Sequence, residues 1–340
     1  MGIASHPRRA APRNRAEVSA LEAVRDESTA ADCTTAILYP SSVYAVVPTL
    51  LCGQVFRFGA SGTGTAGVCG SLALHVASAG PALRLTFSAG SGSLSDAARF
   101  LGVADNVQDD AAESCAYLCA HYPDSAAAVR EVFACSEGLH LLHQPTVETV
   151  VGYVLSVQSS VELVGRRLNA IASLFPANRR QLAGRSVFLF PGLAELRSLE
   201  PADLERLHLG YRSAWLRDLI AGLPEEDVLE QLREECPEER RRFFRKFAGV
   251  GPKVCSCIDL FVYGNDDAFP VDGWVDRGLR RVLGCSSRQG RAVVADPSVL
   301  GPHCGLFGEY LFRYERNRSV RLGVFRDPEP GKRLRSEGTG

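Results

Sequence analysis

A short glycine turn between two helical segments is the feature that most constrains the fold of this chain. The turn is Gly249-Val250-Gly251, and two glycines so close together allow the positive φ angles that reverse a chain sharply. Basic residues precede the turn at 240–246, and an apolar run follows it at 254–262. Pro252 suits the first turn of a helix, where its missing N–H costs little. We therefore expect a helix, a hairpin and a second helix, with the N–H groups of the hairpin free to hold a phosphate.

The segment after this hairpin ends in a second signal. Pro270-Val271-Asp272 closes a loop, and a helical pattern from Trp274 to Leu283 begins directly after the aspartate. An aspartate in this place caps a helix, and that role alone explains its presence. Lys253 lies at the start of the apolar helix, next to the turn. The lysine and the aspartate are therefore the two candidates for chemistry in this part of the chain.

Together these residues resemble the helix-hairpin-helix, glycine/proline-rich loop and aspartate motif of base-excision DNA glycosylases, in which LPGVGxK is followed by PVD. In that superfamily a lysine like Lys253 marks the branch with lyase activity. Three further stretches resemble the 8-oxoguanine DNA glycosylase family: 52–58 is similar to SGQSFRW, 141–175 to LLRQDP…ICSSNNNIAR and 190–223 to FPSLxxL…LGLGYRARYV. The similarities span most of residues 35–325.

The rest of the chain divides by composition. Residues 1–30 lack periodicity, which indicates a disordered or over-extended N-terminus, with a transit peptide as the alternative. Short β-rich runs within 35–90 predict an antiparallel sheet: AILYP, VYAVVPTLL, GQVFRF, GSLALHVAS and ALRLTFSA. Helical patterns follow, with a break near Ser159-Ser160. We expect an α+β fold made of an N-terminal antiparallel sheet domain with helices, 31–140, an all-α helix-hairpin-helix glycosylase domain, 141–325, and a disordered tail, 326–340.

Composition limits the partners. No apolar run approaches the roughly 20 residues needed to cross a bilayer, so we expect no membrane partner. The net charge is −1, so binding to nucleic acid would have to come from a local basic patch. Three arginine clusters form either one shared face or ordinary solvated helix faces: 240–245, Arg277/Arg280/Arg281 and Arg313/Arg316/Arg318/Arg321.

The cysteines indicate reduced thiols. The chain has eleven, an odd number, and no secretory signal. Endonuclease III relatives carry an iron–sulfur cluster on four cysteines after the aspartate motif, whereas only Cys285 and Cys304 follow Asp272 here. Cys255 and Cys257 point about 200° apart on a helix, a poor geometry for one metal. We expect no metal site and no cofactor, with a hydrated or monovalent cation at the hairpin as the alternative.

Lys253 and Asp272 are the expected catalytic residues. The helix dipole and partial burial disfavour the ammonium form of Lys253, and a neutral amine can attack a sugar C1′ to form a Schiff base. Most lysines are solvated and inert, and it is the motif that sets this one apart. The resemblance implies that Asp272 also stabilises the oxocarbenium-like sugar as the glycosidic bond breaks.

Three residues are expected to contact the damaged base. By resemblance, the carbonyl of Gly53 accepts a hydrogen bond from N7–H, a donor that 8-oxoguanine has and guanine lacks. Spacing alone explains Gly53 as the start of a strand. Cys257 and Phe312 match the Cys and Phe of the family segments KVADC and AVLF, which face the two sides of the flipped base. The alternative is that both are core residues of apolar helices.

Other segments are expected to hold the DNA around the lesion. Gln158 and Tyr211 match the wedges that fill the space left by the extruded base, and Arg212 matches an arginine that contacts the orphaned cytosine. Tyr211 is alternatively an aromatic residue at a helix C-cap. The hairpin, Gly249, Val250 and Gly251, is expected to bind a DNA phosphate.

Three positions depart from the family pattern. Leu163 replaces an arginine that also reads the opposite cytosine, and Gly308 replaces a glutamine that contacts the Watson–Crick edge of 8-oxoguanine. Trp274 or its neighbour replaces a histidine that follows the catalytic aspartate. Recognition of the base and of its partner is therefore not carried over whole.

Through this resemblance the chain looks like a bifunctional DNA N-glycosylase and apurinic/apyrimidinic-site lyase of base excision repair. We expect a monomer that flips and excises 8-oxoguanine from damaged double-stranded DNA and then nicks by β-elimination. We expect it to be intracellular and DNA-associated, in a bacterial cytoplasm or nucleoid or in a eukaryotic nucleus. The alternatives are an alkylpurine glycosylase of the same superfamily, which uses water, and a non-catalytic helix-hairpin-helix DNA-binding protein. Lys253 argues against the first, and its coincidence with Asp272 and Gly53 argues against the second.

Overall fold

The computed structural model describes residues 25–26, 33–286, 293 and 296–321. The segments predicted to be disordered, 1–30 and 326–340, lie outside the described residues except for Arg25 and Asp26. Among the described residues, no helix is both long and apolar enough to cross a membrane.

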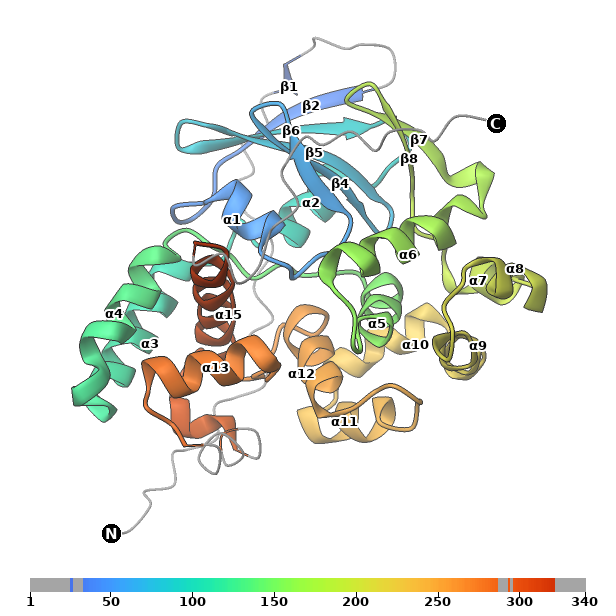
Figure 1. Cartoon of the computed structure of the whole chain (residues 1–340). Coiled ribbons are helices and arrows are strands. Elements are labelled where there is room, and N and C mark those ends of the chain that lie inside the picture. Colours follow the sequence, from blue (N-terminus) through green and yellow to red (C-terminus); the bar gives the residue numbers. More distant parts are fainter. Residues whose placement is uncertain (1–24, 27–32, 287–292, 294–295, 322–340) are drawn as a thin grey trace.

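Six of the described strands form one antiparallel sheet, seen at the top of Figure 1, in the order β1-β2-β6-β5-β4-β3. Their register places Leu74 opposite Phe87 and Val76 opposite Leu85, and all four side chains are buried. Alternate residues thus face one core, as a half-buried strand requires. The prediction of an antiparallel sheet is confirmed. The strands are β1 Arg25–Asp26, β2 Cys33–Leu38, β3 Phe58–Ser61, β4 Gly64–Cys69, β5 Leu72–Ala79 and β6 Ala82–Ser88.

Two of the predicted β-rich runs are wrong. The run VYAVVPTLL contains a helix, α1 Val46–Leu51, and GQVFRF is an irregular segment that leads into β3. Pro48 lies in the first turn of α1, where a missing N–H has no intrahelical partner. Val46 and Leu50, four residues apart, share one face and are buried under the sheet. Packing against the sheet therefore outweighs the β propensity of the valines.

Most of the remaining described chain is helical. The predicted break at Ser159-Ser160 is present, because α5 ends before it and Ser160 caps α6 through its side chain. The helices are α2 Leu94–Leu101, α3 Val107–His121, α4 Ala126–Cys135, α5 Thr146–Leu155, α6 Val161–Ser173, α7 Leu193–Arg197, α8 Pro201–Arg206, α9 Arg212–Gly222, α10 Glu226–Gln231, α11 Pro237–Phe244, α12 Pro252–Phe261, α13 Gly273–Val282 and α15 Cys304–Arg321.

The segment 141–325 is not all-α, which corrects that part of the prediction. It contains a hairpin of β7 Arg179–Leu182 and β8 Arg185–Phe188, which lies beside the main sheet in Figure 1. Ala183 and Gly184 both have positive φ, as a two-residue type I′ turn demands. Leu182 packs with Ala73 of the main sheet, so the hairpin covers part of that sheet.

Besides the small cluster that contains Leu182, three larger buried clusters of the described residues hold the elements together. In the first core, the sheet packs on α1 and α2. A second core contains side chains of α5, α6, α9 and α12. A third core joins α3 and α4 to α13 and α15, which lie together at the left of Figure 1. Helices early in the chain therefore share a core with the last described helix. The division of the chain at residue 140 stays a prediction.

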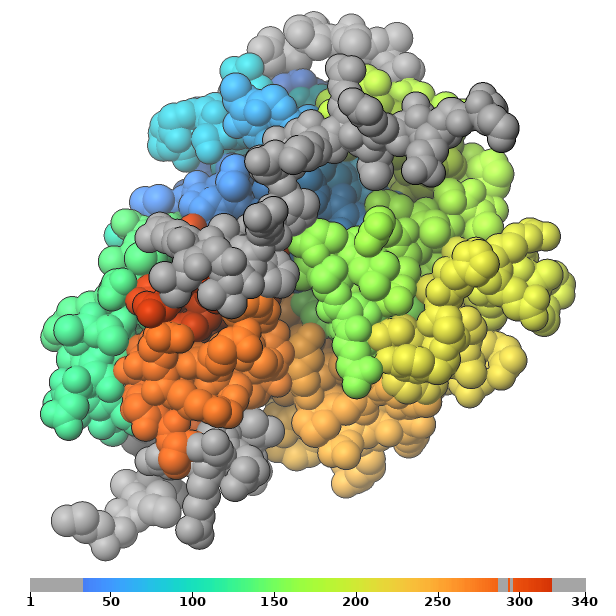
Figure 2. Space-filling view, viewed as in Figure 1, coloured from blue at the N-terminus to red at the C-terminus, as the bar shows by residue number. Residues whose placement is uncertain are grey.

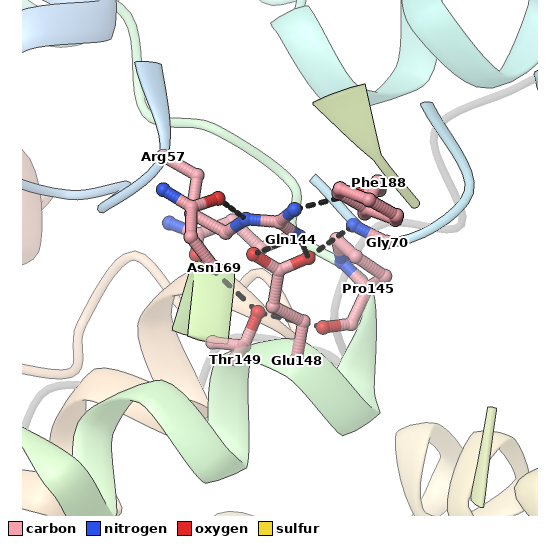
Figure 3. Close-up of polar contacts among 8 residues, drawn as sticks. All are labelled: Arg57, Gly70, Gln144, Pro145, Glu148, Thr149, Asn169 and Phe188. Atoms are coloured by element: carbon pink, nitrogen blue, oxygen red, sulfur yellow. Dashed lines mark hydrogen bonds and ion pairs between the residues drawn. The ribbon is translucent and has the colours of Figure 1, made fainter. Parts of the chain in front are cut away.

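A buried ion pair ties the sheet side of the molecule to the helices (Figure 3). Arg57 Nη1 lies 3.4 Å from Glu148 Oε2 of α5, and Arg57 Nε donates to Asn169 Oδ1 of α6 at 2.8 Å. Arg57 also donates to the carbonyl of Phe188, and Glu148 accepts from the N–H of Gly70. The network fixes the segment that carries Gly53 against α5 and α6.

Candidate active site

A cavity of about 830 Å³ lies where the hairpin, α13, α15 and the segment around Gly53 meet. In Figure 2, the green segment that contains α5 and α6 and the orange segment that contains α13 lie next to each other on the face shown. All of the predicted site residues except Tyr211 and Arg212 line this cavity: Gly53, Gln158, Gly249, Val250, Gly251, Lys253, Cys257, Asp272 and Phe312. The fold thus brings together residues that are far apart in the sequence.

The hairpin between α11 and α12 has the predicted form. Gly249 has a φ of 82°, which favours glycine, and a Cβ at this position would lie 2.6 Å from Cε3 of Trp215. Both the backbone conformation and the close approach of the Trp215 ring therefore require glycine here. Gly251 is the N-cap of α12 and Pro252 is its first residue. The N-cap makes no side-chain hydrogen bond to this terminus, and the N–H of Val250 in the hairpin donates to the carbonyl of Phe247 at 3.2 Å. Phosphate binding by Gly249, Val250 and Gly251 stays a prediction.

Lys253 lies in the first turn of α12 at the wall of the cavity. Its Nζ lies 4.7 Å from the centre of the Tyr153 ring. At this distance the Lys253 side chain makes a cation–π contact with the Tyr153 ring. This contact has no signal in the local sequence, because Tyr153 belongs to α5, about a hundred residues earlier in the chain.

Asp272 is the N-cap of α13. Its Oδ1 accepts from the N–H groups of Trp274 at 2.8 Å and Val275 at 2.9 Å, so the capping role expected from the sequence is observed. Both bonds use the same oxygen, and the residue lines the cavity. The cap holds the carboxylate in one orientation.

Gly53 is held on both sides. The carbonyl of Cys52 accepts from Arg316 Nη1 at 2.9 Å, and the carbonyl of Gln54 accepts from Gln144 Nε2 at 2.7 Å and from the Tyr153 hydroxyl at 3.1 Å. Its φ of 122° lies in the region that favours glycine. The backbone at Gly53 is therefore preorganised.

Cys257 and Phe312 line the same cavity from α12 and α15. Burial raises the pKa of the Cys257 thiol to about 11, although Lys253 lowers it, so the thiol is uncharged at neutral pH. A Cβ built on Gly53 would lie 3.2 Å from Cε1 of Phe312, which places the Phe312 ring directly beside the Gly53 backbone. The cavity is thus walled by an aromatic ring and an apolar thiol.

Gln158, Tyr211 and Arg212 form a cluster at the edge of the cavity. Gln158 has a φ of 52°, which is uncommon for a residue with a side chain. The Tyr211 hydroxyl lies 3.4 Å from Gln158 Oε1, and the Tyr211 ring is 50% exposed. Arg212 is buried and donates to the carbonyls of Val157 and Gln158. Its guanidinium therefore supports the loop in this structure, and its contact with an opposite base stays a prediction.

The arginine cluster at 240–245 is not wholly a surface patch. Arg240 is 2% exposed and pairs with buried Asp259. Arg281 pairs with buried Glu315, and Arg280 with Asp276. These arginines bind acids of their own chain, so the simple picture of one shared basic face is wrong for Arg240.

One acidic residue of the site, Glu309, was not among the residues expected from the sequence. Glu309 lines the cavity from α15, and burial raises its pKa to about 7. The available signal was a single acid within the apolar stretch HCGLFGEYLF of the closing helix. Among the described residues, no group of three or more His, Cys, Asp or Glu side chains is arranged to hold a metal ion.

Comparisons with known proteins fit this arrangement. No protein-family model matches the chain. It is 28% identical over 209 residues to a probable N-glycosylase/DNA lyase of Methanothermobacter thermautotrophicus, which covers 56% of this chain and 66% of that protein. It is 28% identical over 157 residues to the N-glycosylase/DNA lyase of Saccharomyces cerevisiae, covering 43% of this chain and 42% of that protein. The chain therefore spans less than two thirds of the length of these relatives.

The fold is shared with a crystal structure of Clostridium acetobutylicum 8-oxoguanine glycosylase/lyase in complex with DNA that contains cytosine opposite 8-oxoguanine. The TM-score is 0.72 at 20% identity, and the match covers 88% of this chain and 98% of that one. The expected resemblance to the 8-oxoguanine glycosylase family is confirmed.

Proposed function

We propose that this chain, which resembles the N-glycosylase/DNA lyases in sequence and fold, is a bifunctional DNA glycosylase and lyase that excises 8-oxoguanine from double-stranded DNA. The observation that carries the proposal is the cavity in which Lys253, the capped Asp272 and the backbone of Gly53 meet. Its volume of about 830 Å³ falls in the usual range of small-molecule sites, so a flipped base fits.

The chemistry follows from these groups. The neutral amine of Lys253 attacks C1′, the bond from C1′ to the base breaks, and the base leaves with the electron pair and takes up the proton that the amine loses. The carboxylate of Asp272, oriented by its cap, stabilises the positive charge that develops on the sugar. The nitrogen lone pair then forms the C1′=N bond as the bond from C1′ to O4′ breaks, and O4′ takes up a proton, which opens the sugar ring and gives the protonated Schiff base. The Schiff base acidifies the C2′ protons, and loss of one expels the 3′ phosphate by β-elimination. Water then releases the lysine from the sugar.

The surrounding residues supply recognition. The carbonyl of Gly53 is held where an N7–H donor of the lesion can reach it, between Cys257 and Phe312 on the two faces of the base. Gln158 and Tyr211, joined by their side chains, are placed to fill the gap in the duplex, and Arg212 supports the loop that carries Gln158. The hairpin at Gly249, Val250 and Gly251, at the start of α12, binds a phosphate through its backbone.

The proposal extends to the organisation of the protein. The sheet segment, 31–140, contributes Gly53 to the cavity, and the helical segment, 141–325, contributes Lys253 and Asp272. The protein acts as an intracellular, DNA-associated monomer on damaged double-stranded DNA and uses no cofactor.

Borohydride trapping tests the proposal. The protein is incubated with a duplex that carries 8-oxoguanine opposite cytosine, with and without borohydride, and the covalent adduct is counted by gel electrophoresis. Wild-type protein should release the base and be trapped on the DNA, and Lys253→Gln should bind without being trapped. Lys246→Gln is the matched control, because Lys246 lies just before the hairpin, above the Phe243 ring, and does not line the cavity.

Each failure has its own meaning. Base release without trapping would indicate a glycosylase that uses water, and binding without release would indicate a DNA-binding module. Trapping that survives Lys253→Gln would show that another amine is the nucleophile.

A further inference from the structure

Glu309 is a buried acid on the wall of the cavity. It lies on α15, between Gly308 and Phe312, and it is 9% exposed. Its side chain borders the same cavity as Lys253, and its Oε1 has no hydrogen-bond partner among the described residues. A buried carboxyl oxygen without a partner costs free energy, so an occupant of the cavity that brings a donor would relieve that cost.

Groups from several elements face this carboxyl. Burial raises the pKa of Glu309 to about 7, and the Cys52 thiol, Lys253 and Arg316 lower it against the effect of burial. Glu309 is therefore present in both ionised and neutral forms near neutral pH. The titratable and charged groups around it are Cys52 after α1, Tyr153 of α5, Lys253 and Cys257 of α12, Asp272 at the start of α13 and Arg316 of α15.

The neighbouring position on the helix offers no polar contact. A Cβ on Gly308 would lie 2.8 Å from Cε2 of Phe269, and that ring is buried. A longer side chain at 308 would therefore have to displace Phe269. Arg316, one of the four α15 residues that line the cavity, already donates to the carbonyl of Cys52 and to Glu162. Glu309 is thus the hydrogen-bond acceptor that α15 presents to an occupant.

We propose that Glu309 is a specificity-determining residue that accepts a hydrogen bond from an N–H group on the edge of the extruded base. The inference rests on the proposed function and adds to it the part of the site that reads the base from α15. An ionised carboxylate only accepts hydrogen bonds, so it favours bases with N–H donors, and 8-oxoguanine has them at N1, N2 and N7. A base with no donor in reach leaves Oε1 of Glu309 without a hydrogen-bond partner.

Binding to two duplexes separates base reading from structural support. One duplex carries 2′-fluoro-8-oxo-2′-deoxyguanosine, which resists cleavage, and the other carries a tetrahydrofuran abasic site, which has no base. Glu309→Leu should weaken binding to the lesion duplex about tenfold or more and leave the abasic duplex within about twofold. Glu309→Gln should lie between, because its amide oxygen still accepts but without charge.

The control variant is Glu315→Gln, which alters another buried acid of α15 that does not line the cavity. It should leave the ratio of the two affinities unchanged. Equal losses on both duplexes in Glu309→Leu and Glu309→Gln, or no loss on either, would overturn the proposal.

The pH dependence gives an independent readout. The ratio of lesion to abasic affinity should rise from pH 6 to pH 8 in the wild-type protein, because ionised Glu309 is the better acceptor. The ratio should be flat in Glu309→Gln, and an equal rise in that variant would also overturn the proposal. Wild-type protein that fails to excise 8-oxoguanine would instead refute the proposed function, so the two failures are distinguishable.

Discussion

Replacement of Arg57 should lower the free energy of unfolding, because its side chain connects the sheet to α5 and α6. The Arg57 and Glu148 side chains are 1% and 6% exposed, and they meet at 3.4 Å in the network of Figure 3. Arg57→Met keeps most of the buried volume but leaves the Glu148 carboxylate without its charge partner. Breaking a buried pair from one side costs about 3–5 kcal/mol of unfolding free energy.

The sign of the pH dependence follows from the same contacts. Burial raises the pKa of Glu148, and Arg57 lowers it, so Arg57→Met should raise that pKa further. An acid whose folded pKa lies above its unfolded pKa binds protons more tightly in the folded state, and its contribution to stability is lost as pH rises. The deficit of Arg57→Met should therefore be largest near pH 8 and shrink toward pH 5.

Urea denaturation of four variants measures these effects. Arg57→Met should lose about 3–5 kcal/mol at pH 7, and the double variant Arg57→Met/Glu148→Gln should recover at least about 1 kcal/mol, because no unpaired carboxylate remains. Glu148→Gln completes the cycle, and Arg84→Met, an exposed arginine of β6, should change stability by less than about 0.5 kcal/mol. A loss below about 1 kcal/mol in Arg57→Met, or equal losses in the single and double variants at every pH, would refute the reasoning.

Three further outcomes are expected. Asp272→Asn should lower the single-turnover rate of base release more than it lowers stability, since asparagine also caps helices well; wild-type turnover would leave Asp272 a cap alone. Binding to lesion DNA should weaken steeply with salt, with a log–log slope of several, because neutralised phosphates release counterions; a flat response in a salt titration would count against phosphate binding by the basic residues. Selectivity for the base opposite the lesion should be loose, because Leu163 has no donor and Arg212 is engaged with the loop, and Leu163→Arg should sharpen the cytosine preference by about 1–3 kcal/mol. Single-turnover rates on the four pairs decide this, and a strong cytosine preference that Leu163→Arg leaves unchanged would contradict it.

Features with local signals were predictable from the sequence alone. Gly249 and Gly251 with Pro252 specify a turn and the start of a helix whatever packs around them. Asp272 caps α13 and Ser160 caps α6 through bonds to N–H groups at most three residues away. The strands of the sheet showed their alternation within a few residues. In each case the interaction that selects the structure lies within one or two turns of the chain.

Other features were decided only by the tertiary structure. The valine-rich start of α1 is a helix because the sheet buries Val46 and Leu50 on one face. Arg240 is not part of a basic surface, because it is buried and forms an ion pair with Asp259 of the next helix, α12. Glu309 has a raised pKa because the packing of distant segments buries it, and Asp272 raises that pKa further, whereas Cys52 and Lys253 lower it. Burial and charge pairing depend on which distant segments meet, and that information is absent from any short stretch of residues.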